Sequence, residues 1–235
     1  MDVRIISIGC LSAHPLWGER AAVRSGHATT TLIRTRNRVI LVDPGLPAAA
    51  LVARLGERAN IKPQEVTDVF LTSFHPEARR GLPIFENAEW WIHEPEREAI
   101  GVLLATRLRD LAERGGEDDE DHAGSSTAVR AALTHEVATL ERCRPAPDSL
   151  IEHVDLFPLP GVSPGTCGLL ISARSTILIC GDAVPTVEHL ERGMVPTDAQ
   201  DVTRAKESLL EAIEIADLIV PGRDNILANP TRRGM

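Results

Sequence analysis

Four short segments rich in glycine, proline and polar residues constrain this 235-residue chain most, because each follows a strand-like run. In chain order they are Thr72-Ser73-Phe74-His75-Pro76-Glu77-Ala78, Pro160-Gly161-Val162-Ser163-Pro164-Gly165, Gly181-Asp182 and Pro221-Gly222-Arg223-Asp224. Turns of this kind gather polar side chains at one edge of a layered fold, where binding and catalytic groups commonly lie. We therefore expect a candidate site built from these four turns.

Strand-like and helical runs follow the same order in both halves of the chain. Apolar runs of strand length predict strands at residues 3–8, 28–35, 39–42, 68–71 and 89–92, and again at 151–158, 167–172, 176–180 and 218–220. Helical signals mark residues 48–57 and 63–65, and a late helix carries Val202, Ala205, Leu209 and Ile213 on one face. Two β-rich halves, each followed by helices, favour two sheets packed face to face with helices outside.

Two longer helices are predicted in the middle of the chain, each with one apolar stripe to bury. The stripes consist of Ile100, Leu103, Leu104, Leu108 and Leu111, and of Val129, Ala132, Leu133, Val137 and Leu140. The acidic segment 115–121 between them is predicted to be a solvated loop, because adjacent carboxylates lack the spacing of a calcium loop.

Length and charge narrow the class of protein. A chain of 235 residues forms one α/β domain by default, so residues 1–235 are expected to be a single unit. The formal net charge of −9, with no continuous basic stretch, excludes a nucleic-acid partner and favours a small molecule or a protein.

No run is apolar enough for a membrane helix, and the N-terminus is strand-like, so we expect a cytoplasmic protein without a membrane partner. The four scattered cysteines are expected to be reduced, and an unexplained apolar helix face would indicate a homodimer.

The ordered set of turns resembles the metallo-β-lactamase superfamily. That family carries T-H-x-H-x-D-H, then P-G-H-x-P-G, then G-D, then P-G-H, and Asp43-Pro44-Gly45 also resembles its early D-x-G turn. The resemblance implies a four-layered αββα sandwich of two mixed sheets with helices on the outer faces. It also implies an edge site with one or two metal ions, usually zinc or iron, and hydrolysis of β-lactams, thioesters, lactones, phosphodiesters or sulfate esters.

The first motif departs from the family pattern at three of its four ligand positions. His75 is kept, Glu77 stands where the family has Asp, and Ser73 and Ala78 stand at the two other His positions. In the later motifs Asp182 is kept, whereas Val162 and Arg223 replace histidines. Zinc sites usually take three or four protein ligands, so neither metal position of the family is complete here.

Arg223 suggests what replaced the metal. A guanidinium stays protonated and repels a divalent cation, but it can bind carboxylates in a bidentate manner. We therefore predict that Arg223 pairs with Asp182, Glu77 or both. The alternative is that Asp182 only caps its turn, His75 is an ordinary loop histidine and Arg223 points to solvent.

Two function classes follow from these residues, and the sequence leaves open whether the chain is an enzyme. The first is a protein of this fold that has lost the dinuclear metal centre and has no cofactor. It would bind a ligand or partner in the cleft that holds the metal ions in the family, through Ser73, Val162 and Arg223. The second is a hydrolase of an ester, thioester, lactone or phosphoester, with one zinc, iron or manganese ion on His75 and Asp182. His14, His27 or His189 would then supply a third ligand, and His75, Glu77 and Asp182 would be the catalytic residues. Catalysis by Ser73 and His75 alone is disfavoured, because no nucleophile elbow surrounds Ser73.

Overall fold

Two six-stranded sheets form the centre of the molecule in a computed structural model that describes residues 1–114 and 123–232. The first sheet holds β1 (Asp2–Ser7), β2 (Thr30–Arg34), β3 (Val39–Val42), β4 (Asp68–Leu71), β5 (Glu89–Ile92) and β6 (Arg144–Pro145) in that order. The second holds β12 (Leu227–Ala228), β11 (Leu218–Pro221), β10 (Thr176–Gly181), β9 (Cys167–Ser172), β8 (Val154–Pro158) and β7 (Ser149–Ile151). Both sheets mix parallel and antiparallel pairs.

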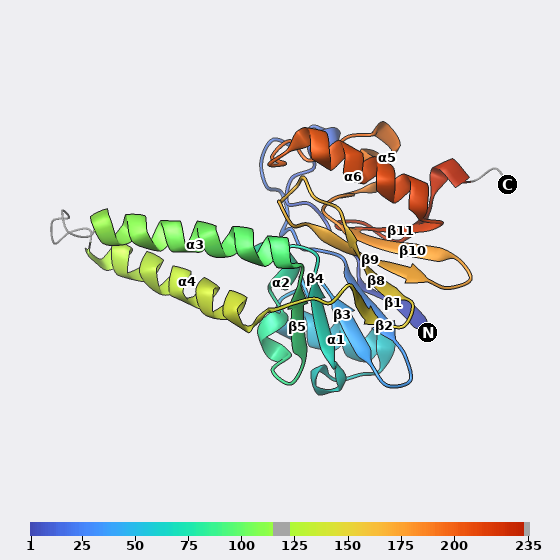
Figure 1. Ribbon diagram of the computed structural model, residues 1–235, viewed down its shortest axis with the longest axis horizontal. Coiled ribbons are helices and arrows are strands. Elements are labelled where there is room, and N and C mark those ends of the chain that lie inside the picture. Colours follow the sequence, from blue (N-terminus) through green and yellow to red (C-terminus); the bar gives the residue numbers. More distant parts are fainter. Residues whose placement is uncertain (115–122, 233–235) are drawn as a thin grey trace.

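Helices lie outside the sheets, as Figure 1 shows. They are α1 (Ala48–Ala59), α2 (Pro76–Arg79), α3 (Glu94–Arg114), α4 (Ala123–Arg142), α5 (Val187–Arg192) and α6 (Val202–Ile215), with short 3-10 turns at Pro15–Trp17, Pro63–Glu65, Leu82–Ile84 and Pro230–Arg232. The predicted αββα sandwich is confirmed. None of the helices in the described part of the chain has the length and apolar character that a bilayer span requires.

Alternating side chains along the strands build three apolar layers. On β3, Ile40 and Val42 belong to the layer between the two sheets, whereas Leu41 belongs to the layer beneath α1. On β10, Ile179 faces the other sheet while Leu178 and Cys180 face the helix side of α5 and α6. This period of two divides the core into an inner layer and two outer layers.

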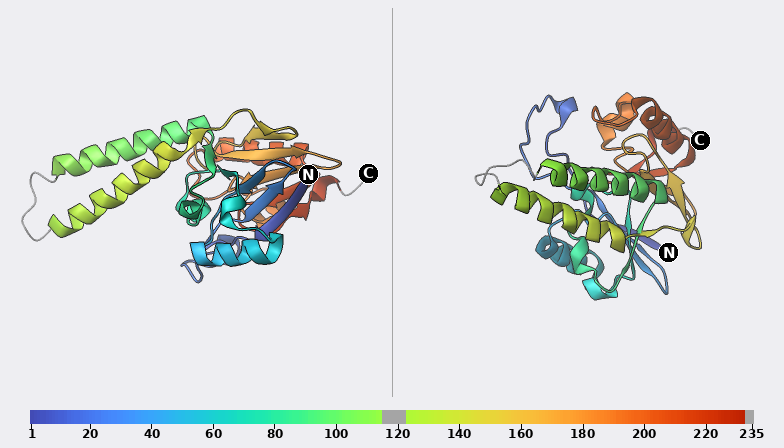
Figure 2. Two further views of the ribbon diagram at one scale, coloured as in Figure 1. Left: turned by 90° about the horizontal axis from the view of Figure 1, so that it is seen from below. Right: turned by 60° about the vertical axis from the view of Figure 1, so that its left-hand side comes forward.

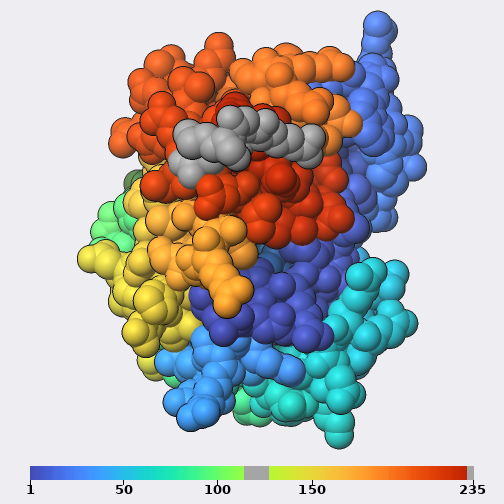
Figure 3. All heavy atoms as spheres, turned by 90° about the vertical axis from the view of Figure 1, so that its right-hand side faces the viewer, coloured from blue at the N-terminus to red at the C-terminus, as the bar shows by residue number. Residues whose placement is uncertain are grey.

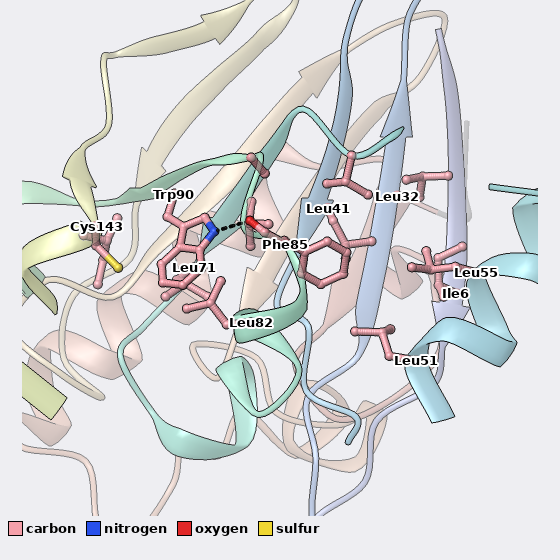
Figure 4. Packing of buried hydrophobic residues seen from close by; sticks show 14 of the residues in the cluster. Ile6, Leu32, Leu41, Leu51, Leu55, Leu71, Leu82, Phe85, Trp90 and Cys143 are labelled. Atoms are coloured by element: carbon pink, nitrogen blue, oxygen red, sulfur yellow. Dashed lines mark hydrogen bonds between the residues drawn. The ribbon is translucent and has the colours of Figure 1, made fainter. Parts of the chain in front are cut away.

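The outer layer of the first sheet explains the two neighbouring tryptophans. Trp90 is buried and its indole donates a hydrogen bond to the Phe85 carbonyl at 3.0 Å, among Leu71, Leu82 and Cys143 (Figure 4). Trp91 lies on the other face of β5 and donates to Asp68 Oδ1 at 2.9 Å. Trp90 therefore packs in the outer layer, and the half-buried Trp91 packs against the inner one. All four cysteines are free thiols, and three of them are buried.

The two halves of the chain meet where the first strands lie against the C-terminal segment. Figure 3 shows this contact from the end opposite α3 and α4, with the early strands in dark blue below the red segment. The backbone of Thr29 donates to the Gly222 carbonyl at 2.7 Å, and the Thr29 hydroxyl donates to the Asp224 carbonyl at 2.7 Å. These bonds fix the last motif turn against the start of β2.

The structure corrects the prediction of one strand at residues 151–158. β7 ends at Ile151 and β8 begins at Val154, and these two residues are paired across a two-residue turn of Glu152 and His153. His153 has a φ of 68°, a left-handed conformation that breaks the strand. The expected strand is therefore a hairpin.

The two long helices also depart from expectation. α3 and α4 pack against each other as an antiparallel hairpin that extends away from the sandwich (Figure 1 and the left view of Figure 2). Near the base of this helical hairpin, Leu104 and Leu140 are buried in the outer layer, but Leu103 and Val129 of the predicted stripes are 42% and 47% exposed. The parts of these apolar stripes that lie farther from the sandwich do not pack against a sheet. The acidic loop predicted at 115–121 lies outside the described residues.

Candidate functional site

The four motif turns come together at one edge of the sandwich. Thr72 to His75 follow β4 and lead into α2, Asp182 follows β10, and Arg223 follows β11. β10 and β11 are parallel neighbours, so their carboxyl ends carry Asp182 and Arg223 to the same place. A Cβ at Gly222 would lie 2.5 Å from the Gly181 backbone, so only glycine allows these two turns to approach so closely.

Arg223 forms the centre of the site. Its Nε donates to Asp182 Oδ1 at 2.7 Å and its Nη2 donates to Asp182 Oδ2 at 2.7 Å. Its Nη1 donates to Glu77 Oε2, so one guanidinium bridges two carboxylates from different turns. The Arg223 side chain is only 3% exposed, compared with 23% for Glu77 and 19% for Asp182. The ion pairs predicted for Arg223 are therefore present, and Arg223 does not point to solvent.

These ion pairs set the charge states at the centre. Burial by itself would raise the pKa of Asp182, but the adjacent Arg223 guanidinium outweighs it and holds the pKa below its usual value. Burial also disfavours the charged form of Arg223, yet Asp182 and Glu77 raise the pKa of its guanidinium above the usual value. Arg223 and Asp182 are therefore both ionised at neutral pH.

A fully buried carboxyl group, Asp43, lies behind this centre. Its two oxygens accept hydrogen bonds from the Thr72 backbone at 2.9 Å and from the Thr72 hydroxyl at 2.7 Å. Burial raises the pKa of Asp43 to about 7, although the bonds from Thr72 oppose that rise. The early turn that contains Asp43 thus supports the loop after β4 from beneath.

A cavity of about 480 Å³ opens over the centre. Its lining includes His75, Glu77, Asp182, His189 and Arg223. A second cavity of about 370 Å³ shares His75, Val162 and Asp182 with it and continues along α3 past Ile100 and Leu103. The candidate site is therefore a cleft that runs from the Arg223 centre to the base of the helical hairpin.

His75 caps α2, and its ring is engaged with backbone. Its Nδ1 accepts a hydrogen bond from the Glu77 backbone at 3.2 Å. The Ser73 hydroxyl accepts from the His75 backbone at 3.4 Å and forms no hydrogen bond with the His75 ring. The geometry thus agrees with the view that Ser73 and His75 do not form a catalytic pair.

His14 and His27, which the sequence offered as additional metal ligands, lie outside the main cavity. His27 contacts the side chains of Ser7 and Cys10, at 3.5 and 3.6 Å, and is not part of the cavity lining. His14 is buried, stacks on Trp17 with ring centroids 4.1 Å apart, and lines a smaller neighbouring cavity. Neither His14 nor His27 lines the cavity that contains His75, and the His14 ring lies 5.7 Å from the His189 ring.

His189 is the histidine that lines the main cavity. The Thr186 hydroxyl donates to Glu188 Oε2 at 2.8 Å, so it must accept from His189 Nδ1, which lies 2.9 Å away. Burial, and then the nearby His14, lower the pKa of His189. A neutral His189 with a proton on Nδ1 leaves its Nε2 as a hydrogen-bond acceptor.

Glu96, which the sequence did not single out, ties two of the site turns together. It is 1% exposed, and its carboxylate accepts from the Phe74 backbone at 3.0 Å, the Ser163 hydroxyl at 2.5 Å and the Gly165 backbone at 3.2 Å. A Glu in the first turn of a helix is usually explained by the helix dipole, so no sequence signal marked its role.

Replacing Glu96 with glutamine should lower the free energy of unfolding by about 2 kcal/mol, because an amide cannot accept at both ends and leaves a buried donor without a partner. Urea denaturation measures the change. Glu94→Gln, two residues earlier in the same helix and exposed, is the matched control and should change stability by less than about 0.5 kcal/mol. Equal effects at the two positions would contradict the role of Glu96 in joining the turns.

The residues at the centre do not fit the family's metal centre. Both oxygens of Asp182 are engaged by a guanidinium, and the buried Ala78 and half-buried Val162 offer no ligand atom. Within the described residues, no group of three or more His, Cys, Asp or Glu side chains is arranged to hold a metal ion. A cation placed beside Arg223 would be repelled.

Two packed mixed sheets with outer helices and a cleft at one sheet edge define the class of layered metallo-hydrolase folds. The sequence model of the metallo-beta-lactamase superfamily matches residues 23–222, so the chain belongs to this superfamily. No curated protein sequence matches the chain.

Solved structures with this fold are similar to the chain over most of its length. A Thermotoga maritima protein assigned as a metallo-beta-lactamase is 18% identical with a TM-score of 0.66, over 97% of this chain and 98% of that one. A Staphylococcus aureus protein assigned as a metal-dependent hydrolase is 15% identical with a TM-score of 0.64, over 95% and 89%. The dizinc quorum-quenching lactonase AidC is 18% identical with a TM-score of 0.60, over 80% and 67%. At these identities the similarity establishes the fold.

Proposed function

We propose that this metallo-β-lactamase-fold protein works without the dinuclear metal centre of its family and uses the cleft to bind a small molecule or a partner. The observation that carries the proposal is the bidentate bond of Arg223 to Asp182, together with its bond to Glu77. A fixed guanidinium neutralises carboxylates that a metal would otherwise neutralise. The cleft is then a preformed polar pocket.

The charges around the cavity indicate which ligands this pocket favours. Its lining includes four carboxylates, those of Glu19, Glu77, Asp182 and Asp198, against the one guanidinium of Arg223. Arg24 neutralises Glu19, but the single Arg223 is shared by Glu77 and Asp182, and Asp198 adds a further negative charge. The remaining excess disfavours anionic ligands and favours neutral or cationic ones. The Nε2 of His189 adds an acceptor, and the second cavity adds the apolar wall of Ile100 and Leu103.

A mononuclear metal-dependent hydrolase is the second candidate function. It is favoured by one observation, namely that His75, Asp182 and His189 line the same cavity. AidC, a dizinc lactonase with the same fold, provides the precedent for hydrolysis. In this alternative the Arg223 side chain would have to release Asp182 before a metal could bind.

Metal content distinguishes the two candidates. The full chain, purified without chelators and analysed by elemental mass spectrometry, should contain well below one zinc, iron or manganese ion per molecule. Added zinc should leave the melting temperature unchanged, because a ligand that binds only the folded state would raise it. Near-stoichiometric metal that disappears in a His75→Ala variant would overturn the proposal and support the hydrolase.

A further inference from the structure

The helical hairpin of α3 and α4 has two faces with different surroundings. One face lines the cleft, through Ile100, Leu103 and Glu136. The other carries an apolar groove of about 610 Å³ between the helices, lined by Gly101, Leu104, Leu108, Val137 and Leu140. Among the described residues, the groove is lined by α3 and α4 alone. The hairpin itself extends clear of the sandwich in Figure 1 and in the left view of Figure 2.

Small and apolar side chains flank this groove at its middle. On α3 they include Val102, which is 68% exposed, and the exposed Ala105. On α4 they are the exposed Thr134 and Ala138. Short side chains let another helix approach closely, and an exposed apolar patch on a projecting element is typical of an interaction surface.

Charges are arranged in the same way on both helices. Near the base of the hairpin, α3 carries Glu98 and α4 carries Glu141; toward the tip, α3 carries Arg109 and α4 carries Arg130. In each helix the Glu and Arg are 11 residues apart, which corresponds to about 16 Å along the axis. All four side chains are exposed, and none forms a salt bridge with another described residue.

We infer that this face, composed of the groove with its flanking residues 98, 102, 105, 109, 130, 134, 138 and 141, binds the same face of a second copy of the chain. An antiparallel two-fold arrangement sets α3 against α3 and α4 against α4 of the partner. Each Glu at the base of one copy then meets an Arg near the tip of the other, at matching spacing. The surface is thus complementary to itself, as a two-fold interface requires.

The opposite arrangement is disfavoured by the same charges. If the two hairpins ran parallel, α3 would face α4 of the partner. Glu98 would then oppose Glu141 and Arg109 would oppose Arg130. Like charges at both ends of the interface would repel, so the charge pattern selects the antiparallel dimer. The other arginines at the base are engaged elsewhere, because Arg97 donates to the Cys143 carbonyl at 3.0 Å and Arg142 lies over the Trp90 ring.

Analytical ultracentrifugation of the full chain tests this inference. The unaltered protein should sediment as a dimer with twice the mass of the 25.5 kDa chain. A Glu98→Arg/Glu141→Arg variant makes both ends of the face positive, and an Arg109→Glu/Arg130→Glu variant makes both ends negative. For each variant alone, the dissociation constant of the dimer should rise by about 100-fold or more, because every Glu–Arg pair across the interface becomes a pair of like charges.

Mixing the two variants should restore a dimer, because the positive face of one then meets the negative face of the other. Asp110→Arg, on the same helix but turned away from the groove, is the control and should remain dimeric. Circular dichroism verifies that every variant is folded. A monomeric unaltered chain, or a dimer that both charge reversals leave intact, would overturn the inference.

Discussion

An Arg223→Met variant should have a free energy of unfolding about 3–5 kcal/mol below that of the unaltered chain at neutral pH. Removing one partner of a buried ion pair leaves the other charge without compensation, and that loss is of this size. Here the substitution leaves Asp182 and Glu77 facing each other in a partly enclosed cleft without the guanidinium that bridges them. Urea denaturation at pH 7 measures the difference.

The pH dependence of that difference identifies its cause. The folded state holds the pKa of Asp182 below its usual value, so the stability it contributes is present above the unfolded pKa and is lost as the pH falls through the folded pKa. Without Arg223, burial instead raises the pKa of Asp182, and the carboxyl can protonate. The gap between the variant and the unaltered chain should therefore narrow as the pH falls below about 4.

Two further variants make the test specific. Arg54→Met removes an ion pair to Glu57 that is exposed on α1, with N and O 2.9 Å apart, and should change stability by less than about 0.5 kcal/mol. Combining Arg223→Met with Asp182→Asn and Glu77→Gln removes the uncompensated charges and should recover most of the loss. If Arg223→Met were no more harmful than Arg54→Met, the guanidinium would not hold the site together.

The positions of the strands and of the site turns could be predicted from the sequence because both depend on local spacing, whereas the ion pairs of Arg223 were predicted from the resemblance to the family's ligand positions. The alternation of Ile40, Leu41 and Val42 identifies a strand with two buried faces. The fixed distance of Arg223 and Asp182 from the ends of their strands places them at one sheet edge. The break between β7 and β8 was missed because Glu152 and His153 are not typical turn residues, and His153 takes its positive φ without a glycine.

Long-range packing accounts for what the sequence did not reveal. The stripes on α3 and α4 predicted buried faces but not that the helices cover each other and leave Leu103 exposed. Likewise Glu96 joins two turns that lie far from it in the chain, and only the fold brings the three together. Periodicity indicates that a face is apolar, but the arrangement of neighbours decides what covers it.

The base of the helical hairpin links the proposed dimer to the cleft. Arg79 of α2 donates to the Phe74 carbonyl at 3.0 Å and forms an ion pair with Glu136 of α4, while Glu96 of α3 accepts from the Phe74 backbone. Through Glu96, α3 therefore contacts the turn that carries His75 directly, and α4 is linked to it through Arg79. Pairing of two hairpins would restrain this turn as well as the cleft wall, so binding in the cleft and self-association would share structural elements.

Asp43 gives a second large effect, with the opposite dependence on pH. Burial raises its pKa to about 7, whereas an unfolded aspartate titrates near 3.9. Between these values the folded chain keeps a proton that the unfolded chain has released. The contribution of Asp43 is therefore fully present below about pH 4 and is lost as the pH rises toward 7, by an amount on the order of 4 kcal/mol.

An Asp43→Asn variant should remove that loss. Asparagine stays neutral, and its side-chain oxygen can still accept the hydrogen bond from the Thr72 backbone. The variant should match the unaltered chain near pH 4 and exceed its stability above pH 7, as measured by urea denaturation across this range.

Asp68→Asn is the contrasting control. Bonds from Arg38, Thr67 and Trp91 overcome burial and lower the pKa of Asp68, so this change should destabilise at neutral pH and lose its effect in acid. If Asp43→Asn behaved like Asp68→Asn, the Asp43 carboxyl would be ionised and stabilised at neutral pH. The conclusion that the Arg223 guanidinium compensates only Asp182 and Glu77 would then be wrong.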